Sequence, residues 1–291
     1  MLFKSKKPHY EYLRKKWVAK NKEVTQKLFD KHLRQAAASA LGGLMLLTTP
    51  ALSIPSSHLA AGDKITITSE EDKNKLLTLE LKDKVPSEVR SLTLQEEQTL
   101  GDLLSKRFGL TVSAQLQGKR LNKSYGLIGG EQHLYRYPGD NVYAHAKDSR
   151  DWAMYGDAGI APGLGAWGYF APSKESFTPK DEERERWYVV AQTFLSPGFA
   201  ERVGEYRDFF KYRKMLVVNS ATGQAVVGDM GDSGPAEFTG KHFGGSPEVM
   251  QAVGLASGPR KGPVLFFFID DPEDKVPLGP IKVQEELLAN R

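Results

Sequence analysis

The chain contains no cysteine among its 291 residues. This absence excludes a structural disulfide, a thiolate metal site and a cysteine nucleophile. It does not exclude export, because a protein of the bacterial envelope can fold without disulfides. The chemistry of this protein therefore has to come from oxygen and nitrogen side chains.

Long hydrophobic runs are also scarce, and the clearest one follows a basic N-terminal tail, residues 1–34. Residues 35–55 carry no charge and are rich in Ala, Leu and Gly. This order is typical of signal peptides, and the run is about as long as the minimum membrane span of ~17 residues. We expect 35–55 to be a cleaved signal or a membrane anchor. The bulk of the chain is then exported, to the outer face of the cytoplasmic membrane or the cell wall. A buried core helix with a basic flank is the alternative.

Outside that tail the chain has no excess of positive charge. Residues 1–34 hold 11 Lys and Arg against three Asp and Glu, which leaves 29 bases against 33 acids in the remainder. A nucleic-acid binder carries its positive charge on a folded face. We therefore expect no nucleic-acid partner, and the sequence leaves the oligomeric state open.

The first folded region is expected over residues 64–135, as a small α+β domain of unassigned role. Strand patterns are read from alternating side chains and the helix from a capping box. In chain order they are strands at 64–68 and 76–81, a helix opened by Thr93 and Glu96 and ending near Phe108, and a strand at 110–116.

From residue 150 to 275 the pattern changes to short strands separated by glycine turns, which is typical of a small β-barrel. Residues 216–218 and 225–227 read as a hairpin around a glycine turn. The apolar run 264–269 predicts a strand buried on both faces. The expected fold class is therefore mainly β with a small α+β region, and residues 276–291 form a C-terminal tail.

The order of features after the hairpin resembles the rare lipoprotein A and expansin families. The likeness covers about residues 150–270 and rests on the hairpin, an Asp-x-Gly-Pro tetrad, a glycine-basic step and a small-residue loop before a short helix. In this chain those features are Val217 to Asn219, Gly223, Val226, Val227, Asp232 to Pro235, Gly240, Lys241 and Ser246. The segment from Trp152 to Gly156 is similar to the opening strand of these families.

This resemblance implies a double-psi β-barrel that binds and cleaves or remodels a cell-wall polysaccharide, peptidoglycan in an exported bacterial protein. Asp232 would be the general acid of a lytic transglycosylase or glycosidase, a role that needs a raised pKa. Aromatic faces suit sugar rings. The residues expected to contact the glycan are Tyr155, Trp152, Trp167, His242 and Ser246.

Two other functions stay open. The families commonly carry His where this chain has Gln192, and Asp where it has Gly245. Those departures favour an expansin-like module that binds the wall without cleaving it. Residues 231–234 also match the nucleophile loop of trypsin-like proteases, with Ser233 as nucleophile and His145 as its base.

No cofactor or metal is expected. Residues 163–168 match the letters of a dinucleotide fingerprint, but no helix pattern opens on them. His133 and His145, with Glu131 and Asp140 nearby, fit no recognised spacing of metal ligands.

Overall fold

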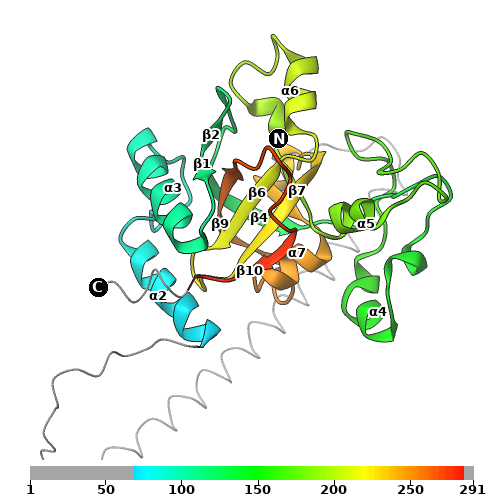
Figure 1. The fold of residues 1–291 in the computed structure, drawn as a ribbon, viewed down its shortest axis with the longest axis horizontal. Helices are drawn as coiled ribbons and strands as arrows, with labels where there is room; N and C mark the ends of the chain where they lie inside the picture. The colour runs from blue at the N-terminus through cyan, green and yellow to red at the C-terminus, as the bar shows by residue number, and fades with distance from the viewer. Residues whose placement is uncertain (1–68, 285–291) are drawn as a thin grey trace, which may run out of the picture. The chain divides into compact units, whose positions relative to one another are not determined.

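The computed structural model describes residues 69–284 of the chain (Figure 1). Its α-helices are α2 (Glu70–Lys82), α3 (Leu94–Phe108), α4 (Ser149–Tyr155), α5 (Pro179–Arg186), α6 (Val203–Phe210) and α7 (Pro247–Ala252). Short 3-10 helices are η2 (Val142–His145), η3 (Gly156–Ala158), η4 (Thr193–Leu195) and η5 (Glu237–Thr239).

The strands are β1 (Val112–Ser113), β2 (Gln115–Leu116), β3 (Lys119–Arg120), β4 (Tyr125–Gly130), β5 (Tyr188–Ala191), β6 (Lys214–Asn219), β7 (Ala225–Ser233), β8 (Phe243–Gly245), β9 (Lys261–Ile269) and β10 (Gly279–Ile281). The predicted export segment 35–55 and the predicted strand 64–68 lie outside the described residues. Within 69–284, no helix has the length and apolar character needed to cross a membrane.

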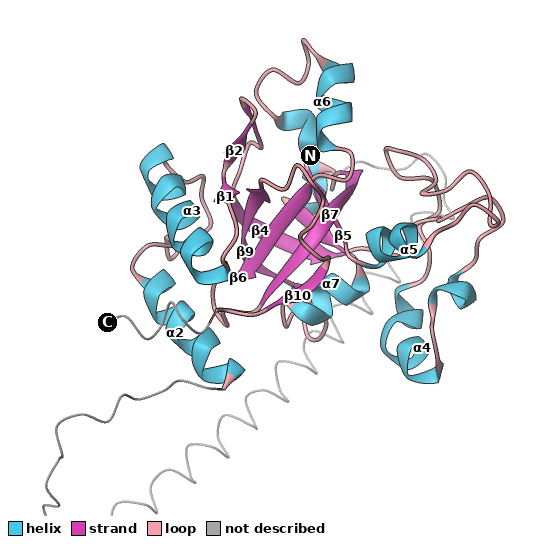
Figure 2. Cartoon of the chain, viewed as in Figure 1, coloured by secondary structure: helices cyan, strands magenta, loops and turns pink. Residues whose placement is uncertain are grey.

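Six strands close into a barrel in the order β9, β4, β8, β5, β7, β6 and back to β9 (Figure 2). The pairs β4–β8 and β5–β7 run parallel, and the other four pairs are antiparallel. Outside the ring, β1 adds to β9 and β10 adds to β7. The fold is thus mainly β with a closed mixed barrel and some helices, and it is compatible with a double-psi barrel.

The predicted hairpin is confirmed as β6 and β7, with Val218 opposite Ala225. Gly223 closes its turn at a φ of 74°, a conformation that favours glycine. Asn219 fixes this turn by accepting the Ala221 N–H at 3.0 Å and donating to the Val253 carbonyl at 2.8 Å. The turn is therefore tied to the end of α7.

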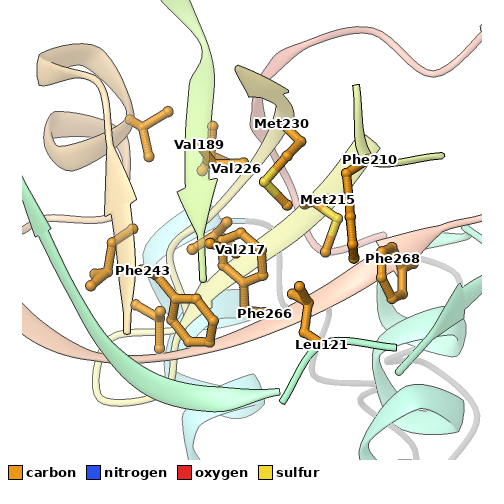
Figure 3. Packing of buried hydrophobic residues seen from close by; sticks show 14 of the residues in the cluster. Leu121, Val189, Phe210, Met215, Val217, Val226, Met230, Phe243, Phe266 and Phe268 are labelled. Carbon is orange, nitrogen blue, oxygen red and sulfur yellow. The ribbon is translucent and has the colours of Figure 1, made fainter. Parts of the chain in front are cut away.

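The barrel interior is filled by aliphatic, aromatic and methionine side chains from every strand of the ring (Figure 3). Phe243 of β8 and Phe266 of β9 stack with ring centroids 4.3 Å apart and planes 5° apart. The predicted buried strand at 264–269 is confirmed, since all of its residues are buried in β9. This strand faces the interior on one side and the helices α2 and α3 on the other.

The outer face of the barrel near β6 and β9 is covered by α2 and α3 (Figure 1). Leu77 and Leu81 of α2 pack with Leu100 of α3 against Leu216 and Leu265 of the barrel. Strands β1 and β4 belong to the same sheet as β9. The described residues of the expected 64–135 domain therefore share a sheet and a core with the barrel.

The predicted strand at 76–81 is wrong, because these residues belong to α2. Alternating leucines suggest a strand, but Leu77 and Leu81 also lie four residues apart on one helical face. Both are buried, whereas Leu79 between them is 64% exposed. Ser69 opens the helix by accepting the Asp72 N–H, and acids fill the first turn. The predicted helix that opens with the capping box of Thr93 is confirmed as α3.

Two other local expectations are corrected. The segment 152–156, expected as a strand, lies in α4 and η3 because Asp148 caps α4 through the N–H groups of Arg150 and Asp151. The charged run 180–186, whose composition alone suggests a solvated loop, forms α5. There Thr178 and Asp181 make a reciprocal capping box around a proline in the first turn.

We expect Phe266→Ala to lower the free energy of unfolding by about 3–5 kcal/mol, because it removes a stacked ring from a closed interior. Phe238→Ala is the matched control, since Phe238 is 94% exposed, and it should change stability by no more than about 0.5 kcal/mol. Urea unfolding of both variants measures this. Equal losses in the two variants would contradict the described core.

Candidate functional site

A β-bulge in β7 sets the position of Asp232. Val189 of β5 pairs with Met230, and the next residue, Val190, pairs with Asp232, so Gly231 is the extra residue. Met230 and Val189 fill the barrel interior, whereas Asp232 and Val190 lie on the outer face. A Cβ on Gly231 would lie 2.6 Å from the Tyr188 Cβ, so only glycine fits the bulge.

Asp232 is held by its backbone neighbours. Its Oδ1 accepts the Ala166 N–H at 2.6 Å and the Ser233 N–H at 2.7 Å. Burial raises the pKa of Asp232 above its ordinary value, although the two N–H groups oppose this shift. Among the described residues, none is hydrogen-bonded to its Oδ2. One carboxylate oxygen is therefore anchored, and the other is available to carry a proton.

A second carboxylate, Glu131, lies within electrostatic reach of Asp232. Glu131 follows β4, and its carboxylate fills the space that a side chain at Gly244 would need. Burial raises the pKa of Glu131, the ion pair with Lys241 opposes that shift, and the charge of Asp232 adds to it. The Lys241 Nζ lies 2.5 Å from the Glu131 Oε1. The site thus joins two carboxyls and one ammonium group.

A surface pocket of about 320 Å³ extends from Glu131. Its basic side chains are Lys241, Arg260 and Lys261, and Glu131 is its single acid. A larger depression of about 790 Å³ is lined by α2 and the 221–224 turn and brings none of these groups together. The pocket beside Glu131 is therefore suited to an uncharged or anionic ligand.

Exposed aromatic side chains stand on three segments that contact or flank Asp232. Phe238 lies on η5, shortly after Asp232 in the chain, and Phe194 lies on η4. The first residue of η4 shares a hydrogen bond with the Ser233 hydroxyl. Tyr169 follows the loop that donates to Asp232. Exposed aromatic faces of this kind suit the apolar faces of sugar rings.

A buried ionic network lies beside the site. His145 is placed between Glu185, at 3.0 Å from its Nδ1, and Asp140, at 2.9 Å from its Nε2. His133 lies 3.3 Å from Glu185 through Nδ1, and Arg136 makes two side-chain hydrogen bonds to Asp140. Although burial opposes the charged form, these hydrogen bonds raise the pKa of His145 to about 9. All five side chains are buried.

This network orders the segment 131–171 that covers the site. Glu185 accepts the Leu134 N–H at 3.0 Å, and the Arg136 carbonyl accepts the Ala171 N–H at 2.9 Å. His133 forms a parallel bridge with Ile160. The same segment carries the Ala166 N–H that holds Asp232, so the network supports the site without forming part of its surface.

Glu248 on α7 is buried beside the network and lacks a full set of partners. Its side chain is 2% exposed, and its Oε2 has no hydrogen-bond partner in the described structure. Arg186 lies 3.8 Å from its Oε1, but Arg186 makes two shorter hydrogen bonds to Asp151. Burial raises the pKa of Glu248 to about 7.

The aromatic residues expected to contact glycan occupy two places. Trp167 adjoins Ala166, so it lies on the loop that holds Asp232, and its Nε1 donates to the Arg207 carbonyl at 3.1 Å. Trp152 and Tyr155 lie on α4, where Trp152 stacks on Tyr143 and Tyr155 contacts the Arg186 guanidinium. The described contacts bring only Trp167 close to Asp232.

The other two expected contact residues have local hydrogen-bond partners. Ser246 is 0% exposed and caps α7 by accepting the Val249 N–H at 3.1 Å. His242 is half-buried, and its Nδ1 accepts the Leu127 N–H at 3.0 Å. Burial lowers the pKa of His242, as do two nearby lysines.

The departures from the family pattern have structural roles. Gln192 is buried and donates to the carbonyls of Pro235 and Lys241, at 3.1 and 3.3 Å, which fixes the chain after Asp232. At Gly245, a Cβ would lie 2.6 Å from the Val249 Cγ1, so no side chain fits without a shift.

The serine hydrolase alternative depends on a contact between Ser233 and His145. In the structure Ser233 shares a hydrogen bond with Thr193. Both ring nitrogens of His145 are engaged by Glu185 and Asp140. His145 is therefore not positioned as a base for Ser233.

No protein-family model matches this chain, and no curated protein matches it closely enough to indicate a relationship.

The sequence did not identify Glu131 as a neighbour of Asp232 or Lys241 as the partner of Glu131, nor did it place Glu185 and Glu248 beside the two histidines. Glu131 was noted only near the histidines, and Lys241 only as part of a glycine-basic step. Glu185 lies in the charged run 180–186, whose composition suggests exposure to solvent. No periodicity or spacing joins these residues, because the strand register brings them together.

Asp229, on the same strand and face as Asp232, provides a test of burial. It is 2% exposed, and burial raises its pKa to about 6 despite Arg184 nearby. When folding raises the pKa of a carboxyl, the folded protein loses stability as the pH rises from the pKa of the unfolded state to that of the folded state. We expect Asp229→Asn to be more stable than wild type by on the order of 2 kcal/mol at pH 7, and equal to it near pH 4.

Urea unfolding at pH 4, 5.5 and 7 measures this difference, with Asp208→Asn on the exposed face of α6 as the control. A difference that does not change with pH would show that Asp229 is not held in a desolvated environment.

Proposed function

We propose that this chain is an exported enzyme that cleaves a cell-wall polysaccharide, with peptidoglycan as its substrate and Asp232 as its general acid. Its barrel is proposed to be of the double-psi type, as the order of hairpin, Asp-x-Gly-Pro tetrad and short helix suggests. The export segment at 35–55, whether signal or anchor, is part of this proposal.

The observation that carries the proposal is the environment of Asp232. Its carboxyl lies on the outer face of the barrel, and burial raises its pKa. One of its oxygens is anchored, and the other has no hydrogen-bond partner among residues 69–284. A general acid must hold its proton near neutral pH and present it to the leaving oxygen. The upward direction of the pKa shift and the position of the second oxygen both favour this role.

Glu131 is proposed as the second carboxylate of the reaction. Burial raises the pKa of Glu131, and the ion pair with Lys241 opposes that shift by favouring the charged form. A negative carboxylate stabilises the positive charge that develops on the sugar ring when the glycosidic bond breaks. Water, or an intramolecular hydroxyl of the sugar, then completes the cleavage.

The surroundings favour a large anionic glycan over a small neutral one. Lys241, Arg260 and Lys261 border the pocket next to Glu131 and are suited to the carboxylates of wall peptides. The exposed rings of Phe194 and Phe238 offer stacking surfaces along the chain.

We expect Asp232→Asn to lower glycan cleavage at least about 100-fold, because the amide cannot donate the required proton. Release of muropeptides from purified sacculi measures this. Asp229→Asn is the matched control, since it makes the same change on the same face of β7 and should retain cleavage. Full activity in Asp232→Asn would overturn the assignment of the acid.

The pH profile separates the two carboxyls. Cleavage requires Asp232 to be protonated and Glu131 to be ionised, so wild-type activity should fall both at high and at low pH. In Glu131→Gln the fall at low pH should disappear, while the lower rate that remains should still decline at high pH. If Glu131→Gln lost activity at low and at high pH as wild type does, Glu131 would have no part in the mechanism.

A non-enzymatic wall-binding module is the second candidate, favoured by Gln192 and Gly245 at positions where the resembling families carry His and Asp. Such a module would sediment with sacculi and release no fragments. Phe238→Ala should weaken sedimentation under both functions, so fragment release is the deciding measurement.

A further inference from the structure

A cluster of two histidines and a glutamate lies behind the proposed active site, on the segments that cover it. One ligand atom from each of His133, His145 and Glu185 lies within 4.8 Å of the others. His133 comes from the loop after β4, His145 from η2 and Glu185 from the last turn of α5. The cluster therefore joins three segments that are distant in sequence.

Two of the distances between donor atoms are close to the ligand spacing around a tetrahedral ion. Nδ1 of His133 lies 3.3 Å from Oε1 of Glu185, and Nδ1 of His145 lies 3.0 Å from Oε2. Ligands placed ~2.0–2.1 Å from a tetrahedral zinc ion are separated by roughly 3.3 Å. Two imidazole nitrogens and one carboxylate oxygen supply three protein ligands, and a water would complete a four-coordinate set.

The cluster also has the outer partners that metal sites use. Nε2 of His145 lies 2.9 Å from Asp140, which orients the ring so that Nδ1 faces Glu185. Arg136 holds Asp140 through two side-chain hydrogen bonds. A carboxylate on the remote nitrogen of a ligating histidine is the usual arrangement around zinc.

A separate observation indicates that a positive charge is lacking here. Glu248 is buried, its Oε2 has no partner in the described structure, and it lies within electrostatic reach of His133 and Glu185. Arg136 is paired with Asp140, and Arg186, which lies 3.8 Å from Glu248, makes its shorter contacts with Asp151. A divalent cation held by His133, His145 and Glu185 would place positive charge close to this carboxylate.

We propose that His133, His145 and Glu185 form a structural site for a divalent transition-metal ion, with Asp140 and Glu248 as outer partners. Imidazole and carboxylate donors suit zinc, which is the probe for the test. The ion would join the segments that carry the Ala166 N–H, and so support the position of Asp232. The site is distinct from the proposed chemistry and does not depend on it.

The first experiment is a Zn²⁺ titration of the full-length protein after treatment with a chelator. We expect one tight site, and a rise of about 5–10 °C in the unfolding midpoint at a free zinc concentration about 100 times the Kd. Glu185→Gln and His133→Ala should lose both effects. His242→Ala, which removes a histidine outside the cluster, should keep them. The proposal would be overturned if Glu185→Gln, His133→Ala and His242→Ala all bound zinc as wild type does.

If the variants of the ligand residues fail to fold, a substitution at an outer partner and a spectrum of the wild-type complex still test the proposal. Asp140→Asn should weaken zinc binding about 10–100-fold with an unchanged circular dichroism spectrum. X-ray absorption of the wild-type zinc complex should show two imidazole nitrogens and carboxylate oxygens at about 2.0–2.1 Å. Absence of a tight site in wild type, or a spectrum without imidazole, would refute the inference.

Discussion

The bulge at Gly231 is the constraint on which the rest of the proposed site depends. A regular strand would turn Asp232 into the barrel interior, where Met230 and its neighbours leave no room for a carboxylate. The extra residue moves Asp232 to the outer face, and contact with Tyr188 leaves space there for glycine alone. The same shift aims the carboxyl at the Ala166 N–H.

The carboxyl on this face is supported from two directions. On one side, Gln192 fixes the chain after the tetrad, and on the other the buried network of Glu185 and His145 orders the covering segment. Several charged side chains are therefore buried in a region that adds little to the hydrophobic core. Clusters of buried polar groups are typical of functional sites, where burial sets the protonation state of a carboxyl.

Local signals explain which parts of the fold were predictable from the sequence. The hairpin followed from β-branched runs around Gly223, whereas the leucines at 76–81 satisfied helix and strand periods equally and needed the tertiary core to decide. Asp232 was identified from its flanking Gly and Pro. Glu131 was not identified as its partner, because it reaches the site through the pairing of β4 with β8 and through the missing side chain of Gly244.

The central claim is that Asp232 carries a raised pKa on an accessible face of the barrel. The most direct measurement is an NMR titration of the aspartate carboxyl carbons in the full-length protein, with the Asp232 signal assigned by mutation. The account predicts that Asp232 titrates above the ordinary range of aspartate carboxyls. An Asp232 that titrates within that ordinary range, or below it, would contradict the account.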